Sequence, residues 1–297
     1  MTIRRAALVF AFIGTAAAAY APQPARTLSL PLLPLNLHFR ALQPGDVILA
    51  ELRADAFVKS GVIRFLGQTR ALESAVPGAR PFALFGIDLA ALPRAYPFEF
   101  KSVRAGGRVE ASVRTITVEP KAFSRQRLSV AEAMAVPPAA ERERIRRESE
   151  LVTDILNRIS PDWLGDGPFQ FPLPGREPYP NFGQQRIYNG KTASVHNGVD
   201  ISAPWGEPAR ASNRGRVVLA GRLYFSGNTV IIDHGRGVFT FYGHFSKLTV
   251  KRGEIVRKGQ VIGRVGATGR STGPHVHWSA RIGNARVDPC ALLGLPL

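Results

Sequence analysis

Cysteine, acidic residues and long apolar runs are all scarce in this chain. Its 297 residues include one cysteine, Cys290, so an internal disulfide is excluded. Cys290 follows Asp288-Pro289 with no histidine beside it in the sequence, which favours a packed apolar side chain over a catalytic one. Beyond the N-terminus, no stretch approaches the roughly 20 apolar residues of a membrane helix. A H-E-x-x-H sequence is also absent, which excludes a helical zinc site of that kind.

The shortage of acidic residues leaves a strongly basic protein. There are 22 Asp and Glu against 39 Lys and Arg, a formal net charge of +17, which favours anionic partners. The N-terminus argues against nucleic acid, because Arg4 and Arg5 precede an apolar run over 6–13 and small residues as far as Ala19. This pattern predicts a signal peptide over residues 1–21. We expect export, no nucleic-acid partner, no stable membrane span after cleavage, and an anionic cell envelope as the setting.

The first part of the mature chain is predicted to be a β-sandwich. An extended, proline-rich linker over residues 22–34 leads into 35–129, where short apolar runs alternate with Gly and Pro turns. Val109, Ala111 and Val113 alternate with polar residues, which predicts one buried and one wet face. No cluster of His, Cys or acidic residues marks a site in this domain. Its expected role is positioning or binding.

A helical linker is predicted over residues 130–162. The segment is rich in Glu, Arg and Ala, and Glu143 with Arg147 forms a supporting i,i+4 pair. Pro161 ends the pattern. The apolar positions recur at helical spacing: Ile145, Val152, Ile155, Leu156 and Ile159. This pattern favours an amphipathic helix that packs on a neighbouring domain, with a partner-binding helix as the alternative.

Residues 163–297 return to short β-type runs separated by glycine turns, with no helical period. The interpretation is an antiparallel β-roll or split barrel, whose concave face lets side chains from several strands converge. The fold class is therefore mainly β: an N-terminal β-sandwich, a linker helix, and a C-terminal β-roll domain.

The C-terminal domain also carries five of the six histidines. In His275-Val276-His277-Trp278, two histidines one residue apart point the same way only on an extended strand, with Val276 and Trp278 on the opposite, apolar side. His234 ends a predicted strand before a glycine turn and is expected to hold that turn in place.

The remaining polar residues of this block suggest a metal centre. His196 has a carboxylate, Asp200, four positions on, and His244 follows in Tyr242-Gly243-His244. Catalytic zinc takes three protein ligands and leaves its fourth place to water. His196, Asp200 and one histidine of the H-x-H pair supply that number. His244 and the other histidine of the pair are then candidates for the proton acceptor and the stabiliser of negative charge.

The motifs His196-x-x-x-Asp200, Tyr242-x-His244 and His275-x-His277, in this order, resemble the lysostaphin-type zinc metallopeptidases, which cleave peptidoglycan peptides. The resemblance covers roughly residues 182–289 and includes the glycine-rich lead-in over 266–274. It implies one zinc per chain in a β-sheet groove.

The resemblance also assigns roles to residues. His196, Asp200 and His277 match the zinc ligands. His275 matches the general base, and His244 matches the second catalytic histidine, which steadies the water and the oxyanion.

An Asn-containing segment before the first histidine often shields the site in such families. Asn189-Gly190 or Asn181-Phe182 could fill that place here, with Asn189 the expected substrate contact. Tyr188 is a further candidate for stabilising the oxyanion.

Taken together, the sequence predicts a zinc-dependent endopeptidase that hydrolyses peptide cross-links of peptidoglycan in the periplasm or cell envelope, with an envelope regulatory partner as a further expectation. The first alternative is a non-catalytic envelope regulator that activates a cell-wall amidase. The intact set of five residues argues against it, because such relatives usually lack one or more of them. A secreted protease of general proteins is the second alternative, and the basic surface favours anionic wall polymers over it.

Overall fold

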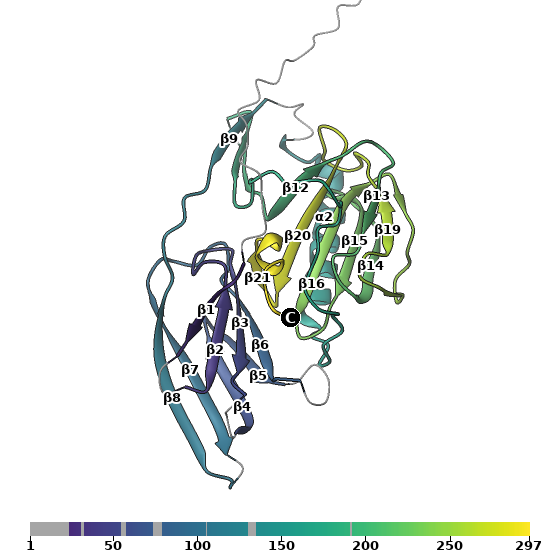
Figure 1. Cartoon of the computed structure of the whole chain (residues 1–297). Helices are drawn as coiled ribbons and strands as arrows, with labels where there is room; N and C mark the ends of the chain where they lie inside the picture. Colours follow the sequence, from purple (N-terminus) through teal and green to yellow (C-terminus); the bar gives the residue numbers. More distant parts are fainter. Residues whose placement is uncertain are drawn as a thin grey trace, which may run out of the picture.

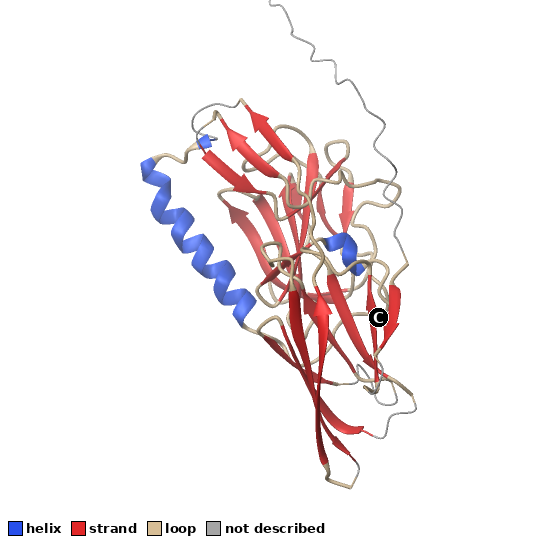
Figure 2. Ribbon diagram, turned by 90° about the vertical axis from the view of Figure 1, so that its left-hand side faces the viewer, coloured by secondary structure: helices blue, strands red, loops and turns tan. Residues whose placement is uncertain are grey.

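The computed structural model describes residues 24–30, 33–54, 58–73, 79–104, 106–129, 135–190 and 192–297. The predicted signal peptide, residues 1–21, lies outside the described residues. Strands dominate both halves of the molecule, as the sequence predicts, and one long helix lies against one side (Figures 1 and 2).

The N-terminal half is a sandwich of two four-stranded antiparallel sheets. The first has the order β1-β2-β3-β6 and the second the order β5-β4-β7-β8. Their bounds are β1 (Arg26–Ser29), β2 (Leu35–Phe39), β3 (Val47–Leu52), β4 (Val58–Phe65), β5 (Gln68–Leu72), β6 (Phe82–Gly86), β7 (Ala95–Arg104) and β8 (Val109–Thr117). Residues 26–29 of the predicted linker thus form an edge strand of the first sheet, paired with β2.

Strands β3 and β6 are buried on both faces, which explains why they are almost entirely apolar. Ile48 and Phe85 pack into the core of the sandwich, whereas Val47, Leu49 and Leu84 pack into the core of the C-terminal domain. Alternate side chains of one strand therefore serve two different cores. The domain junction is consequently an apolar interface, and the β1-β2-β3-β6 sheet is shared between the two halves.

The predicted buried face of β8 is wrong. Val109 and Val113 are each 56% exposed. The inward positions are the alternate ones, since Arg114 lies opposite the buried Phe98 in the pairing with β7. β8 is the edge strand of its sheet, and there the inward face carries charged and polar side chains, which guards an open edge against pairing with another chain.

The helix is α2 (Arg142–Asn157), preceded by the short η1 (Ala139–Glu141). It lies within the predicted linker, and Glu143 and Arg147 form the expected ion pair at 3.5 Å. Ile155 and Leu156 are buried as predicted, but Ile159 lies beyond the helix end and is 47% exposed. Among the described residues, no helix is both long and apolar enough to cross a membrane.

The C-terminal half is built on a large antiparallel sheet with the order β12-β20-β16-β15-β14-β18 and with β21 paired to β20. Its strands are β12 (Gly198–Ser202), β14 (Gly215–Leu223), β15 (Gly227–Asp233), β16 (Val238–Phe245), β18 (Ile255–Val256), β20 (His275–Ile282) and β21 (Ala285–Val287). A small sheet of β13 (Pro208–Arg210), β19 (Val261–Arg264) and β17 (Lys247–Leu248) packs beside it, and η2 (Pro289–Leu292) follows β21.

A three-stranded sheet joins the two halves. It consists of β9 (Arg125–Leu128), β10 (Gln185–Tyr188) and β11 (Thr192–Val195). The predicted boundary at residue 129 leaves β9 with the sandwich, whereas β9 pairs in parallel with β10 of the C-terminal half. This pairing spans some 60 residues of sequence, so no local pattern reveals it.

One face of the large sheet carries the candidate site. Opposite residues in an antiparallel pair point to the same face. Asp200 lies opposite His277, and His277 lies opposite Gly243. Val276 and Trp278 point to the other face and are 0% exposed, as the sequence predicts.

The helix α2 covers a more distant part of that same face. Phe241 and Phe239 alternate with the buried-face residues of β16, and Phe239 packs with Ile155 and Leu156 of α2. Figure 2 shows the helix lying along this side of the strands. The open part of the face is therefore the end where β12 and β20 carry the polar side chains.

Candidate metal centre

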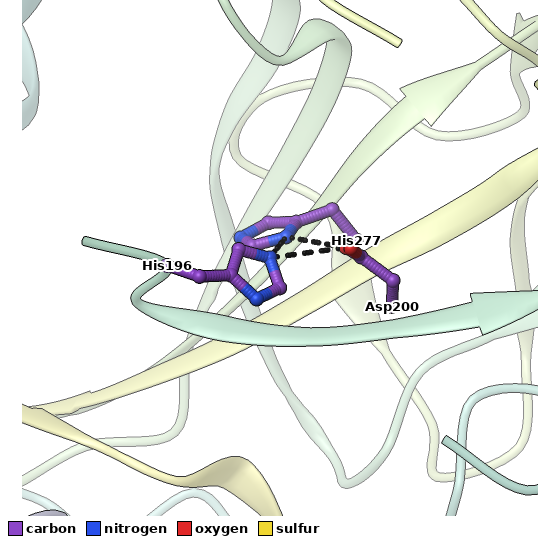
Figure 3. Close-up of side chains that lie close together, drawn as sticks. All are labelled: His196, Asp200 and His277. Carbon is purple, nitrogen blue, oxygen red and sulfur yellow. Dashed lines mark hydrogen bonds and ion pairs between the residues drawn. The ribbon is translucent and has the colours of Figure 1, made fainter. Parts of the chain in front are cut away.

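Three predicted ligand atoms meet at this open end (Figure 3). His196 Nε2 lies 2.9 Å from His277 Nδ1, and each of these nitrogens lies 3.1 Å from Asp200 Oδ1. The residues come from the segment before β12, from β12 itself and from β20. Within the described part of the chain, they form the cluster of His and acidic side chains that could hold a metal ion.

The chemistry of these atoms calls for a cation. His196 Nδ1 donates to the Asn181 carbonyl at 3.0 Å, so its Nε2 carries a lone pair. Burial lowers the pKa of His277, which favours the neutral ring. Burial alone would raise the pKa of Asp200, but the two neighbouring imidazoles hold it well below its usual value. When both rings turn a lone pair toward Asp200 Oδ1, three electron-pair donors face one another, and this arrangement is stabilised by a cation among them.

The spacing of the three atoms fits the same conclusion. A tetrahedral ion with ligand bonds near 2 Å separates its ligands by about 3.3 Å. The observed separations of 2.9 to 3.1 Å are close to that value. Two imidazoles and one carboxylate form a donor set that is typical of catalytic metal sites.

The second oxygen of Asp200 is held from behind. Asn181 Nδ2 donates to Asp200 Oδ2 at 3.0 Å, and Arg186 donates to the same oxygen at 2.8 Å. Asn181 Oδ1 also accepts from the backbone N–H of Asp200 at 3.2 Å. These contacts leave Oδ1 directed at the two histidines. Such supporting contacts fix the orientation of metal ligands and tune their strength.

Gly198 is required by close strand approach. A Cβ at this position would lie 2.4 Å from the Trp278 carbonyl oxygen and 2.8 Å from His277 Cε1. Gly198 begins β12 in extended form. Glycine here lets β12 lie against β20 without displacing the His277 ring.

His244 reaches the open face through an unusual backbone conformation. Gly243 already points to that face, so regular alternation would send His244 to the other one. Instead His244 has φ 66°, in the left-handed region that non-glycine residues rarely adopt. Its ring centre lies 4.6 Å from that of His275 and 6.1 Å from that of His277. Backbone strain thus places this ring beside the metal centre.

The two histidines outside the ligand set present the same nitrogen. His244 Nδ1 donates to the Thr268 carbonyl at 2.7 Å, and His275 Nδ1 donates to the Gly273 carbonyl at 2.8 Å. A carbonyl cannot donate, so both rings carry their proton on Nδ1 and keep a lone pair on Nε2. Burial, with His277 and His275 nearby, lowers the pKa of His244 to about 3 and keeps its ring neutral. His275 Nε2 lies 3.6 Å from Asp200 Oδ1.

The two expected substrate contacts occupy different places. Tyr188 is 6% exposed, and the Arg270 guanidinium lies 5.1 Å from its ring centre. Asn189 sits in the β10–β11 turn with φ 50°, and its N–H donates to the Leu128 carbonyl. Of the two Asn-containing segments, the one with Asn181 contacts the metal ligands.

Sequence reasoning missed Arg186 and Thr268. Arg186 is one of many arginines, and nothing in its neighbourhood marks the pairing with Asp200 across 14 residues. Thr268 acts through its carbonyl, which every residue has. The glycines around it were the available signal, because a Cβ on Gly266 or Gly269 would lie within 2.5 Å of neighbouring backbone.

His234 has the structural role that the sequence predicts. It is 0% exposed, and its ring bonds the Arg214 carbonyl at 2.8 Å and the Thr240 hydroxyl at 2.7 Å. Burial lowers the pKa of His234 to about 4. Cys290 is buried, as predicted.

The fold and the site together define a two-domain β protein with a His–Asp–His metal centre flanked by two further histidines. Residues 194–289 match the model of peptidase family M23. A crystal structure of a Pseudomonas aeruginosa protein described as a peptidase M23 superposes with a TM-score of 0.63 and 29% identity, over 86% of this chain and 96% of that one. The likeness therefore includes the N-terminal sandwich as well as the site.

Two of the curated relatives each match about a third of the chain. The DD-carboxypeptidase/endopeptidase Mpg of Neisseria meningitidis is 48% identical over 101 residues, and the peptidoglycan DD-endopeptidase ShyA of Vibrio cholerae is 43% identical over 99 residues. These matches cover 34% and 33% of this chain but only 23% of each relative. The chain thus matches less than a quarter of the length of these relatives. The similarity to peptidase family M23 therefore rests on residues 194–289 of the C-terminal half.

Proposed function

We propose that this protein is a zinc-dependent endopeptidase that hydrolyses peptide cross-links of peptidoglycan. The observation that carries the proposal is the meeting of His196, Asp200 and His277 as three acceptor atoms, with the open Nε2 atoms of His244 and His275 beside them. The names of the curated relatives support the substrate class. The net charge of +17 supports an anionic polymer as the substrate.

Zinc is the ion that the donor set favours, because two imidazoles and a carboxylate with an open position are typical of catalytic zinc. Bound there, it would polarise the scissile carbonyl and lower the pKa of a water molecule to about 7. His196 Nε2, His277 Nδ1 and Asp200 Oδ1 are the atoms that would hold it.

The protein's own residues then move the proton. The water oxygen attacks the carbonyl carbon while His275 Nε2 accepts a proton from the water. Nε2 is the free nitrogen because the Nδ1 proton of His275 stays hydrogen-bonded to the Gly273 carbonyl. The imidazolium returns this proton to the amine nitrogen as the C–N bond breaks. His244, neutral and with Nε2 open, accepts a hydrogen bond from the second hydrogen of the water and fixes its orientation. Of the two roles expected for His244, holding the water is the one its tautomer supports.

The setting that we propose is the cell envelope. The signal peptide over residues 1–21 and action in the periplasm remain predictions from the sequence. We propose the N-terminal sandwich as a positioning domain, because its β1-β2-β3-β6 sheet is fused to the catalytic domain by a shared apolar core. A regulatory partner in the envelope is part of the same prediction.

The test is a digest of purified sacculi with the protein alone, with soluble products identified by mass. We expect products of cross-link hydrolysis, one zinc per chain, and loss of both zinc and at least about 10³-fold of the activity in His277→Ala. His38→Ala is the matched control, because His38 lies in the sandwich and bonds Thr27. Product release only when an amidase is added would favour the non-catalytic regulator. Hydrolysis by the metal-free protein would contradict the proposal, and cleavage of casein at a similar rate would favour a general protease.

A further inference from the structure

Arg270 lies in the loop that holds both catalytic histidines. The loop runs over residues 266–274, between β19 and β20. Two positions before Arg270, Thr268 accepts the Nδ1 proton of His244. One position after it, Ser271 lies 3.3 Å from His275 Nδ1. Arg270 thus lies in the sequence between Thr268, which contacts His244, and Ser271, which contacts His275.

The backbone of this loop is held tightly. The Arg270 N–H donates to the Phe225 carbonyl at 2.8 Å, in the β14–β15 hairpin. The Thr268 hydroxyl donates to the Phe245 carbonyl at 2.8 Å and accepts from the Asn228 N–H at 2.9 Å. These hydrogen bonds therefore fix the position of the Arg270 backbone, from which its side chain extends.

The guanidinium of Arg270 rests between two aromatic rings. It lies 4.5 Å from the ring centre of Phe225 and 5.1 Å from that of Tyr188. Tyr188 is two positions along β10 from Arg186, which reaches Asp200, so both side chains lie on one side of that strand. Arg270 consequently lies on the side of β10 that faces the metal centre. Stacking on aromatic faces orients a guanidinium and leaves its N–H edges free.

The positive charge of Arg270 has no acidic neighbour. Of the ion pairs among described residues, none includes Arg270, and its side chain is half-buried. Arg186, the other arginine near the ligands, is already bonded to Asp200. An arginine that is oriented, only half-buried and without an acidic partner beside a catalytic centre is suited to bind a carboxylate in a bidentate manner.

We propose that Arg270 is a specificity-determining residue that binds a free carboxylate on the amine side of the scissile amide. The inference rests on the proposed function and names its substrate class more closely. When a diamino dicarboxylic acid such as diaminopimelate supplies the cross-linking amine, the carbon that carries the amide nitrogen also carries a carboxylate. When lysine supplies it, that carboxylate is missing. The proposed substrate is therefore a cross-link of the first kind.

The test compares two cross-linked peptides that differ only at this position, with the carboxylate free or converted to the carboxamide. We expect the wild-type protein to cleave the free acid about 10- to 100-fold better in kcat/KM, the range of one or two charge-assisted hydrogen bonds. Arg270→Ala should lower kcat/KM for the free acid to the level of the amide, mainly through KM, with zinc content unchanged. Arg270→Lys should retain part of the preference, because lysine keeps the positive charge. It should not retain all of it, because lysine lacks the paired N–H donors that bind both carboxylate oxygens. Arg257→Ala is the matched control, since Arg257 is exposed at the far edge strand β18.

A second readout separates binding from catalysis. In the His275→Ala background, the free acid should bind more tightly than the amide, and adding Arg270→Ala should remove the difference. A preference that survives Arg270→Ala, or an equal loss on both peptides, would overturn the inference while the proposed function stands. Failure of the wild-type protein to cleave either peptide would instead overturn the proposed function and the inference with it.

Discussion

The metal centre and the domain junction both bury hydrogen-bond acceptors close together, but only at the junction does a positively charged side chain lie between them. At the junction, Asp46 and Asp288 have side chains 1% and 7% exposed, and the Arg40 guanidinium lies between them at 2.7 and 2.9 Å. At the metal centre, the corresponding acceptors are His196, Asp200 and His277, and the chain places no cation among the three facing atoms. The chain itself supplies the cation between the two carboxylates of the junction, whereas the three facing atoms of the centre need a bound ion.

The same contrast separates the buried histidines. Both ring nitrogens of His234 are bonded within the chain, to a carbonyl and to a hydroxyl. His196 is bonded on Nδ1 alone, and its Nε2 faces two other acceptors. Burial therefore does not distinguish a functional polar group from a structural one. What distinguishes these two histidines is that the chain gives His234 a hydrogen-bond partner at each ring nitrogen, whereas Nε2 of His196 faces the other ligand atoms.

The largest effect is expected at the junction. Arg40→Met should lower the free energy of unfolding by about 3–5 kcal/mol, because Asp46 and Asp288 stay buried without their cation. Denaturant unfolding measures this change. The folded variant should still take up one zinc, since Arg40 has no contact with the metal ligands.

Arg64→Met is the matched control for Arg40. Arg64 lies in the same sandwich, but its side chain is 64% exposed and its ion pair with Glu99 spans 3.7 Å. The expected change in its free energy of unfolding is within about 0.5 kcal/mol. A loss of less than about 1 kcal/mol in Arg40→Met would contradict the view that the junction depends on this cation.

The second effect concerns His234 and pH. Its ordinary pKa of 6.5 applies in the unfolded chain, and burial lowers the pKa to about 4 in the fold. Between these values the unfolded state binds more protons, so stability falls as pH falls from 6.5 to 4, by about 3 kcal/mol from this group. His234→Gln should remove that part of the slope, measured as thermal or urea unfolding at several pH values. Loss of the ion at low pH is common to both proteins, so equal slopes would contradict the assignment.

Much of this architecture could be predicted from local patterns. The short β-type runs predicted within residues 163–297 include the segments that form β14, β15 and β16. They are predictable because strand alternation and glycine turns are local properties. The burial of Val276 and Trp278 behind the H-x-H pair follows from the same period of two.

The errors arise where the outcome depends on what lies across the sheet or between domains. The exposure of Val109 and Val113 is set by the edge position of β8, which no pattern within β8 contains. The pairing of β9 with β10 and the contact of Arg186 with Asp200 join segments far apart in the sequence. His244 reaches the site through a strained φ, whereas regular alternation predicts the opposite face.

The smallest expected effect is on zinc affinity, and it tests whether Asn181 or Asn189 supports the metal ligands. Asn181 bonds Asp200 through its side chain and accepts the Nδ1 proton of His196 through its carbonyl. Asn181→Ala removes the side-chain contacts and should weaken zinc binding about 10- to 100-fold, the usual effect of losing a contact behind a metal ligand. Competition with a chromogenic chelator measures the affinity directly.

Asn189→Gly is the control that makes this comparison sharp, because glycine tolerates the φ of 50° at residue 189 and leaves the turn intact. Its zinc affinity should stay at the wild-type value. If Asn189→Gly weakened zinc binding as much as Asn181→Ala, the orientation of Asp200 would depend on the β10–β11 turn as a whole. In that case the orientation of the Asp200 carboxylate would come from loop packing and not from its hydrogen bond with Asn181. The metal centre would then depend on packing in the same way as the domain junction does.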